Sequence, residues 1–363
     1  MLARRTKLRH PGSGLVLETP LLVPAFSSKG FKLGKSKKLT KGKNFFHSKK
    51  DLPREANPTS GFLSEVTEAL KVSAQVLTES MLVSAYDIFH KHIPLPYSIV
   101  SPEITFVDSG GYEKEEDYDF SAVFRSSCPV NDWSRELLEE VLDSWPAYVP
   151  AVFVSNDQGC RGKPISDQAD EARELFGKYR KQHLCALLIK PVSDELTFKK
   201  TLEEINNHIE DLSDFDIVAV AEKDLGNSVL LSMENIAKIR FAMDDAKIHV
   251  PIHIFGSLDP LSACLYFLAG AEIFDGLTWI RYAYFKGMAI YYRNYGVLSL
   301  GVHERDNIVR ADTLMKNIYY LRELQENMKV FTVDGDFNKF QENAEFLSRA
   351  WDKLKVRFER RKI

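Results

Sequence analysis

Short apolar runs alternate with amphipathic stretches along most of this chain. Residues 21–26, 184–189 and 217–220 are almost entirely apolar, as is typical of parallel strands that are buried on both faces. Residues 194–212 and 230–245 repeat apolar side chains with the period of an amphipathic helix. The alternation of such strands and helices predicts a parallel α/β fold.

Seven or eight strand candidates, each followed by a helix, favour a (β/α)8 TIM-type barrel. A doubly wound sheet is disfavoured because no GxGxxG motif opens the first β–α unit. The expected strands are 21–26, 74–77, 104–107, 148–154, 184–189, 217–220, 251–255 and 272–274. The expected helices are one that starts within 59–70, then 133–145 with Asp132 as N-cap, 167–182, 194–212, 230–245, 259–269, 312–328 and 337–358.

The pattern divides the chain at about residue 300. Residues 1–300 are expected to form the barrel, including a basic insertion at about 29–58, and residues 301–363 a C-terminal helical extension packed on it. The sequence Asp334-Gly335-Asp336 predicts a turn between the last two helices. With 363 residues, 44% of them hydrophobic, the chain can bury a core of this size.

The net charge of −3 conceals a strong asymmetry. The first 50 residues hold 13 Lys and Arg and one acidic residue, so the remaining residues carry −15. This lysine-rich, glycine-broken segment suits a phosphate backbone, with Phe31, Phe45 and Phe46 available to stack on bases or to wedge between them. A solvated loop without a specific role is the alternative. The residues predicted to contact nucleic acid are Lys29, Lys32, Lys35, Lys37, Lys38, Lys41, Lys43 and Arg281.

Hydropathy and cysteine usage indicate a soluble, cytoplasmic protein. No run approaches the roughly 20 apolar residues of a membrane helix, and the first residues lack the apolar core of a signal peptide. We expect buried, reduced thiols, with no disulfide framework, no metal and no cofactor, because no CxxC spacing occurs. The four cysteines are Cys128, Cys160, Cys185 and Cys264.

The segment Asp108-Ser109-Gly110-Gly111-Tyr112 places a carboxylate and an aromatic ring on either side of two glycines at an expected strand end. An acid, a stacking surface and a backbone that can approach a ligand closely suit a flat, polar heterocycle. In a barrel, the C-terminal ends of the strands meet at one mouth, so Asp157, Glu222 and Asp275 are expected to converge with Asp108.

Each of these features also has an ordinary interpretation. Asp-Ser-Gly-Gly and Asp275-Gly276 are common turn sequences, and Asp157 could cap the next helix. Asp259 followed by Pro260 is typical of an N-cap with proline at the first helical position. His253 has the pattern of a packed strand histidine.

Together, the motifs resemble the tRNA-guanine transglycosylases and their relatives that act on DNA. The resemblance covers about residues 15–295 and implies base exchange, in which a guanine is cut from its sugar and replaced by a 7-deazaguanine without breaking the backbone. The matching segments are Thr19-Pro20-Leu21-Leu22-Val23-Pro24, Asp108-Ser109-Gly110-Gly111-Tyr112, Asp157, His253-Ile254-Phe255-Gly256-Ser257-Leu258-Asp259-Pro260 and Phe274-Asp275.

The resemblance also implies residue roles. Asp275 would be the nucleophile that attacks C1′ to form a covalent glycosyl–enzyme intermediate, and Asp108 the general acid/base. Tyr112 would stack on the base, and Asp157 would accept hydrogen bonds from its N1–H and amine. Two unlike roles require unlike environments, so Asp275 should stay ionised while the pKa of Asp108 rises. The remaining residues predicted to bind the base are Ser109, Gly110, Gly111, Lys190 and Glu222.

Three departures from the family bear on the substrate. Most tRNA-acting members have a zinc site of three cysteines and a histidine after the barrel, whereas this chain has no cysteine after Cys264. The segment Ile189-Lys190-Pro191 stands where many members have glutamine and glycine lining the base pocket, and residues 221–226 replace a small glycine-rich loop. Lys190 and Glu222 could therefore pair across the pocket or read the 7-substituent.

The favoured function is replacement of guanine in DNA by a 7-deazaguanine such as 7-cyano-7-deazaguanine. Such an enzyme must extrude its target base, at a cost of a few kcal/mol. The alternatives are a tRNA-guanine transglycosylase lacking zinc, a catalytically silent nucleic-acid-binding homologue, and another (β/α)8 enzyme, such as a glycosidase-like hydrolase using Asp108 and Asp275 as its carboxylate pair. A homodimer and a protein partner from the same pathway stay open.

Overall fold

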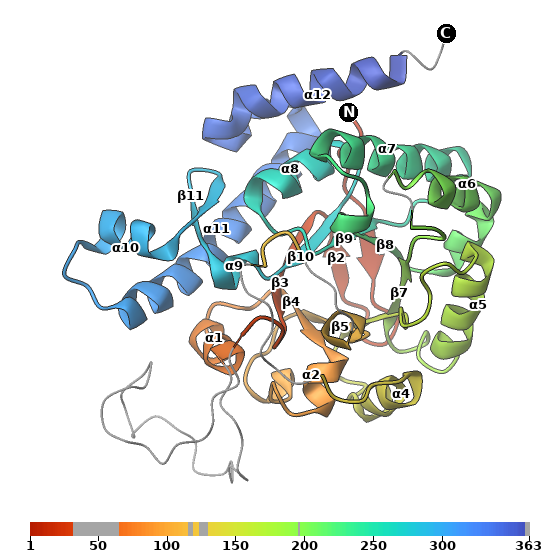
Figure 1. Cartoon of the computed structure of the whole chain (residues 1–363), viewed down its shortest axis with the longest axis horizontal. Helices are drawn as coiled ribbons and strands as arrows, with labels where there is room; N and C mark the ends of the chain where they lie inside the picture. Colours follow the sequence, from red (N-terminus) through yellow and green to blue (C-terminus); the bar gives the residue numbers. More distant parts are fainter. Residues whose placement is uncertain (32–64, 115–118, 123–129, 195–196, 360–363) are drawn as a thin grey trace.

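Eight parallel strands close into a barrel in the computed structural model, which describes residues 1–31, 65–114, 119–122, 130–194 and 197–359 (Figure 1). The strand order around the barrel is β10-β3-β4-β5-β6-β7-β8-β9, and every neighbouring pair is parallel. Helices surround the barrel on its outer side. The predicted (β/α)8 architecture is therefore confirmed.

The barrel strands are short, and nearly all of their residues are buried. Side chains on one face fill the barrel, and those on the other face pack against the helices, which explains the continuous apolar runs. The strands are β3 (Leu21–Phe26), β4 (Ser80–Ser84), β5 (Ile104–Asp108), β6 (Ala151–Val154), β7 (Leu184–Ile189), β8 (Ile217–Ala221), β9 (Ile252–Phe255) and β10 (Ile273–Gly276).

The strand expected at 74–77 is wrong. This run lies just after helix α1 (Glu65–Ser73), where the backbone N–H groups of Val76 and Leu77 donate to the Ser73 carbonyl. The strand of this repeat is β4, a few residues later, which carries a serine at each end. Its polar ends made the strand less apparent than the apolar turn before it.

The helices overlap their expected ranges, and one expected N-cap differs. Helix α4 is capped by Ser134, whose Oγ accepts from the Leu137 N–H, and not by Asp132. At α8, Asp259 accepts from two backbone N–H groups ahead of Pro260, as its sequence pattern suggests. The helices outside the C-terminal region are α1, α2 (Ala85–Phe89), α3 (Gly111–Lys114), α4 (Arg135–Ser144), α5 (Ile165–Phe176), α6 (Lys199–Asn207), α7 (Val229–Asp245), α8 (Pro260–Leu268) and α9 (Thr278–Arg281), with 3₁₀ turns η1 (Pro96–Ser98), η2 (Ile209–Asp214) and η3 (Glu222–Asp224).

Two short antiparallel hairpins were not expected. Strands β1 (Lys7–Arg9) and β2 (Val16–Glu18) precede the barrel, and β11 (Ala283–Phe285) and β12 (Met288–Ile290) follow it. After β2, a buried ion pair joins Arg240 of α7 to Glu272 at 2.8 Å, and the Thr19 hydroxyl donates to the same carboxylate. This cluster ties three segments together at the N-terminal end of the barrel.

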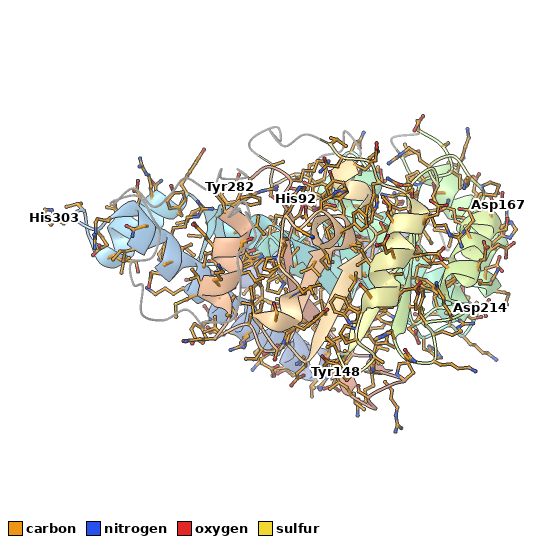
Figure 2. All side chains as sticks on the ribbon, turned by 90° about the horizontal axis from the view of Figure 1, so that it is seen from below. His92, Tyr148, Asp167, Asp214, Tyr282 and His303 are labelled. Atoms are coloured by element: carbon orange, nitrogen blue, oxygen red, sulfur yellow. The ribbon has the colours of Figure 1, made fainter. Side chains whose placement is uncertain are left out.

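The C-terminal region consists of α10 (Tyr292–Leu300), α11 (Asp306–Asp334), the 3₁₀ turn η4 (Phe337–Asn343) and α12 (Ala344–Glu359). Helix α11 packs against α1, α8 and β3, and its Gln325 side chain accepts from the Leu22 N–H at 2.8 Å. Gly335 ends α11 in the left-handed conformation, which confirms the predicted turn. The α10–α11 corner projects from the barrel, with His303 at the far end of the molecule from Asp167 and Asp214 (Figure 2).

None of the helices in the described ranges combines the length and the apolar character needed to cross a membrane.

Candidate active site

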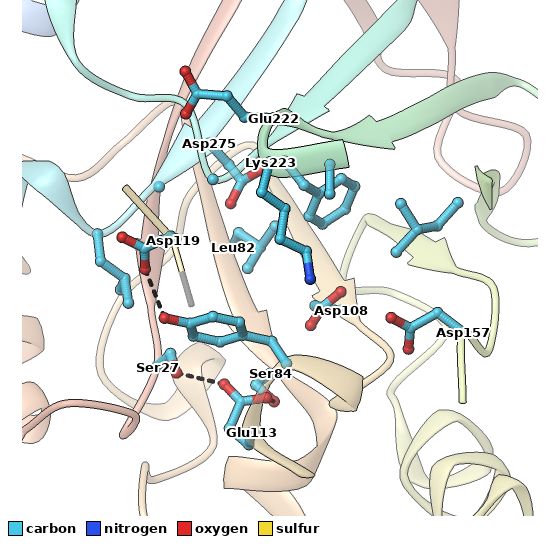
Figure 3. A pocket seen from close by; sticks show the side chains of 18 of the residues that line it. Ser27, Leu82, Ser84, Asp108, Glu113, Asp119, Asp157, Glu222, Lys223 and Asp275 are labelled. Atoms are coloured by element: carbon cyan, nitrogen blue, oxygen red, sulfur yellow. Dashed lines mark hydrogen bonds between the residues drawn. The ribbon is translucent and has the colours of Figure 1, made fainter. Parts of the chain in front are cut away.

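Side chains from the C-terminal ends of the strands converge on one cavity at the barrel mouth (Figure 3). Asp108 is the last residue of β5, Asp275 lies near the end of β10, and Glu222 follows β8 directly. The cavity measures about 100 Å³. The predicted site residues that line it are Asp108, Tyr112, Asp157, Lys190, Glu222 and Asp275.

Asp108 is a buried carboxyl with few donors. Its Oδ2 accepts from the Gly110 N–H at 3.3 Å, and only 7% of the residue is exposed. Burial, and then the negative charges of Asp157 and Asp275, raise the pKa of Asp108 to about 7. The expected rise of this pKa is confirmed, although the surrounding carboxylates contribute to it as well as the apolar walls.

Asp275 is held by His253, a residue of the neighbouring strand β9. The His253 Nε2 lies 2.9 Å from Asp275 Oδ1, and the imidazole is fully buried with its ring stacked on Phe255. Burial raises the pKa of Asp275, and the hydrogen bond from His253 opposes that rise. His253 is indeed a packed strand histidine, but it is also the hydrogen-bond partner of the predicted nucleophile.

The two ring nitrogens of His253 have different surroundings. Its Nε2 lies against Asp275 Oδ1, to which a proton on Nε2 donates. Its Nδ1 is buried and has no hydrogen-bond partner among the described residues.

Asp157 forms an ion pair with Lys190 at 2.7 Å, and the Ser109 hydroxyl donates to its other oxygen at 2.6 Å. Burial alone would raise the pKa of Asp157, but the Lys190 ammonium and the Ser109 hydroxyl together hold it below its ordinary value. Pairing of Lys190 with Glu222 was one of two possibilities; in the structure Lys190 pairs with Asp157, and Glu222 lies beside the hydroxyls of Tyr266 and Ser257. Asp157 is therefore a fixed carboxylate.

The two glycines allow close packing within the protein. A Cβ on Gly111 would lie 2.0 Å from Asp157 Oδ1, and one on Gly110, which has a φ of 86°, would lie 2.8 Å from Trp133 Nε1. The sequence suggested that these glycines let the backbone approach a ligand closely. In the structure they let the backbone approach the side chains of Asp157 and Trp133. Ser109, Gly110 and Gly111, which were predicted to bind the base, are not among the residues that line the cavity, and the Ser109 hydroxyl instead holds Asp157.

Tyr112 is anchored at its hydroxyl, which donates to Asp119 Oδ2 at 2.6 Å. Arg281 forms an ion pair with the same carboxylate at 2.7 Å, and the ammonium of Lys29 lies 4.2 Å from the centre of the Tyr112 ring. Both cations were expected to contact nucleic acid. In the structure the Arg281 side chain is 9% exposed and paired with Asp119, a residue of the cavity lining, and Lys29 donates to the Tyr112 carbonyl.

The rest of the basic segment lies outside the described residues. This applies to Lys32, Lys35, Lys37, Lys38, Lys41 and Lys43, and also to Phe45 and Phe46. Phe31 is described and is buried, with the Arg281 guanidinium 5.5 Å from its ring centre. The interpretation of Phe31 as an exposed wedge is therefore wrong.

Three charged cavity residues escaped sequence reasoning: Glu113, Asp119 and Lys223. Glu113 accepts from the hydroxyls of Ser27 and Ser84, while burial and the charges of Asp87 and Asp108 raise its pKa to about 8. Glu113 and Asp119 both belong to a run of acids at 113–119. Nothing in the sequence marks Glu113 and Asp119 as residues that line the cavity, and residues 115–118 lie outside the described residues.

Within the described ranges, no group of three or more His, Cys, Asp or Glu side chains is arranged to hold a metal ion. Cys160, Cys185 and Cys264 are buried free thiols, while Cys128 lies outside the described residues. Neither a protein-family model nor a curated protein matches this chain.

Proposed function

We propose that this protein is a base-exchange transglycosylase that replaces guanine in DNA with a 7-deazaguanine. The observation that carries the proposal is the convergence of Asp108, Asp157 and Asp275 with the Tyr112 ring around one narrow cavity at the barrel mouth. A flat base between these groups would have an aromatic face to stack on, a fixed carboxylate for its donor edge, and two further carboxyls near its glycosidic bond.

The reaction proceeds in two displacements at C1′ of the sugar. In the first, the Asp275 carboxylate bonds to C1′ while the C1′–N9 bond breaks, and protonated Asp108 gives its proton to the departing guanine. In the second, Asp108, now ionised, accepts the N9 proton of the incoming 7-deazaguanine. The N9 atom then bonds to C1′ and Asp275 leaves. No atom is gained or lost apart from the exchanged base.

The environments of the two carboxyls support these roles. A pKa of about 7 lets Asp108 hold or release a proton near neutral pH. Burial raises the pKa of Asp275, and the His253 hydrogen bond opposes that rise in favour of the ionised form that the nucleophile requires. Asp157, with its lowered pKa, would accept hydrogen bonds from N1–H and the exocyclic amine of guanine.

DNA is preferred to tRNA as the polymer because of two features of the sequence. The first 50 residues carry a net +12, which suits a phosphate backbone. The chain also has no cysteine after Cys264 to complete the zinc site typical of the tRNA-acting relatives. A tRNA enzyme that dispenses with zinc is the remaining candidate.

The test is base exchange with labelled guanine. Purified protein is incubated with labelled guanine and, in parallel, duplex DNA, single-stranded DNA or tRNA, and label in the polymer is counted. We expect label in DNA, and none with Asp275→Asn. Label confined to tRNA would reject the DNA assignment, and no label in any polymer would reject base exchange.

A further inference from the structure

An exposed aromatic ring stands at the edge of the base pocket, and we infer that this ring, Phe120, is a wedge that fills the gap left in duplex DNA when the target guanine enters the pocket. The inference rests on the proposed base exchange. Phe120 lines the base pocket, yet 61% of the residue is exposed. It also lines a wider cavity beside the base pocket, so it lies between the two cavities and not on the floor of either.

The segment that carries Phe120 is a tight turn held at its first residue. The Asp119 carbonyl accepts from the Ala122 N–H at 3.1 Å, and the Asp119 carboxylate accepts from the Ser121 N–H at 2.8 Å. One guanidinium nitrogen of Arg281 contacts both oxygens of that carboxylate, at 2.7 and 2.8 Å, and donates to the Ser121 hydroxyl at 2.6 Å. These contacts fix the backbone on both sides of Phe120 while its ring remains exposed.

The charged groups that hold this turn are buried, although the apolar ring is not. The Asp119 and Arg281 side chains are 11% and 9% exposed. Removing two charges from water is costly and is offset only where the charges are closely paired and hydrogen-bonded, as they are here. The result is a rigid mount for an exposed phenylalanine, which a ring that must enter a base stack requires.

Asp119 also connects Phe120 to the ring on which the base would stack. The Tyr112 hydroxyl donates to Asp119 Oδ2 at 2.6 Å, and Figure 3 shows Asp119 at the edge of the base pocket with this hydrogen bond as a dashed line. Phe120 follows Asp119 directly, so its backbone is fixed relative to Tyr112. Among the described residues that line the base pocket, Phe120 alone is both aromatic and exposed.

The chemistry of extrusion explains why such a ring is useful. When a guanine leaves a duplex, its two neighbours in the strand lose a stacking partner, and an apolar side chain inserted between them fills the space. Phe31, which was expected to act in this way, is buried. Single-stranded DNA has no such gap, so the contribution of Phe120 should be confined to paired DNA.

The test measures exchange of labelled guanine by Phe120→Ala on three DNA substrates of one sequence. They are the paired duplex, a duplex with an abasic analogue in place of the opposite cytosine, and the single strand. We expect kcat/KM to fall about tenfold or more on the paired duplex and to stay within about twofold of wild type on the single strand. The loss should be smaller opposite the abasic analogue, because that guanine is already unpaired.

Two further variants serve as controls. Phe120→Trp keeps an aromatic ring and should stay within about threefold of wild type on the paired duplex. Tyr148→Ala removes another exposed ring, from the segment just before β6 at the other end of the barrel, and should leave exchange on all three substrates unchanged. Figure 2 shows Tyr148 on the opposite side of the molecule from Tyr282, whose hydroxyl contacts the Ser121 carbonyl.

A wild-type rate for Phe120→Ala on the paired duplex would reject the inference and leave base exchange intact. Equal losses on the duplex and the single strand would also reject it, because Phe120 would then support the pocket and not the gap. Exchange by the wild-type protein on single strands alone would do the same. Absence of exchange on every DNA substrate would overturn the proposed function and the inference together.

Discussion

Asp108 and Asp275 share one buried cavity, but their immediate partners differ. Burial, and then the charges of neighbouring carboxylates, raise the pKa of Asp108 to about 7, and its carboxyl accepts from one backbone N–H. Burial also raises the pKa of Asp275, but the hydrogen bond from His253 opposes that rise. Asp275 therefore has a side-chain donor that favours its charged form, as the nucleophile requires.

The pH dependence of exchange should report the Asp108 carboxyl. Its pKa is raised, so the protonated form that assists guanine departure is abundant below about 7 and is lost above it. We expect the rate of labelled guanine release to fall as pH rises from 6.5 to 8.5. Asp108→Asn should lower the rate at all pH values and abolish its fall between pH 6.5 and 8.5. A wild-type rate that increases through this range would contradict the acid role.

Replacing His253 with phenylalanine should slow the reaction and leave the fold in place. The ring would keep its contact with Phe255, but the donor to Asp275 would be lost. Loss of one hydrogen bond to a carboxylate costs about 1.5–3 kcal/mol, which corresponds to about a 10- to 100-fold lower kcat. His183→Phe removes another buried histidine, near the other end of the barrel, and serves as control. Equal kcat values for the two variants would contradict this role.

At the scale of elements, most of the barrel could be predicted from the sequence, because apolar residues recur with different periods in buried parallel strands and in amphipathic helices. Strand β7 matches the expected range 184–189 exactly at both ends, whereas β4 was missed because its terminal serines weaken the apolar signal. The acids at the strand ends could be foreseen because the barrel brings those ends together. The inward positions of Glu113 and Asp119 could not, since they depend on how Ser27 and Arg281 pack against them.

The start of α4 gives a direct test of a local feature. Ser134 caps this helix through the Leu137 N–H, while Asp132 lies two residues outside the cap. Ser134→Ala should lower the free energy of unfolding in urea by about 1 kcal/mol. Asp132→Ala should change it much less, within about 0.5 kcal/mol. A larger loss of unfolding free energy for Asp132→Ala than for Ser134→Ala would show that Asp132 caps the helix, as the sequence predicts.

At the scale of the whole molecule, the barrel concentrates acids that would be ionised in the unfolded chain. The pKa values of Asp108, Glu113 and Glu222 rise to about 7, 8 and 7 on folding, mainly through burial. A carboxyl with a raised pKa stabilises the fold at low pH, and that stabilisation is lost as pH rises toward the folded-state pKa. The active site therefore lowers stability at the pH where it works.

Glu113 gives the clearest form of this effect. Between pH 6.5 and 8 the folded protein still binds a proton at Glu113 that the unfolded chain does not, so the free energy of unfolding should fall with rising pH. Glu113→Gln should reduce this fall by on the order of 1 kcal/mol. The buried His183, whose pKa is lowered to about 4, also changes the pH dependence, because the unfolded chain protonates it near pH 6.5, but this contribution is the same in both proteins and cancels in the comparison. The measurement is urea unfolding of the wild type and Glu113→Gln at pH 6.5 and 8. The same fall in the free energy of unfolding for both proteins would contradict the raised pKa of Glu113.

The central claim is that Asp275 forms a covalent bond to the sugar. Protein mixed with guanine-containing DNA should be quenched in denaturant, digested with protease and nuclease, and analysed by mass spectrometry. We predict a deoxyribosyl adduct on the peptide that contains Asp275, absent from Asp275→Asn and lost when excess guanine is added before the quench. An adduct on a different residue, or exchange by Asp275→Asn at the wild-type rate, would contradict the account.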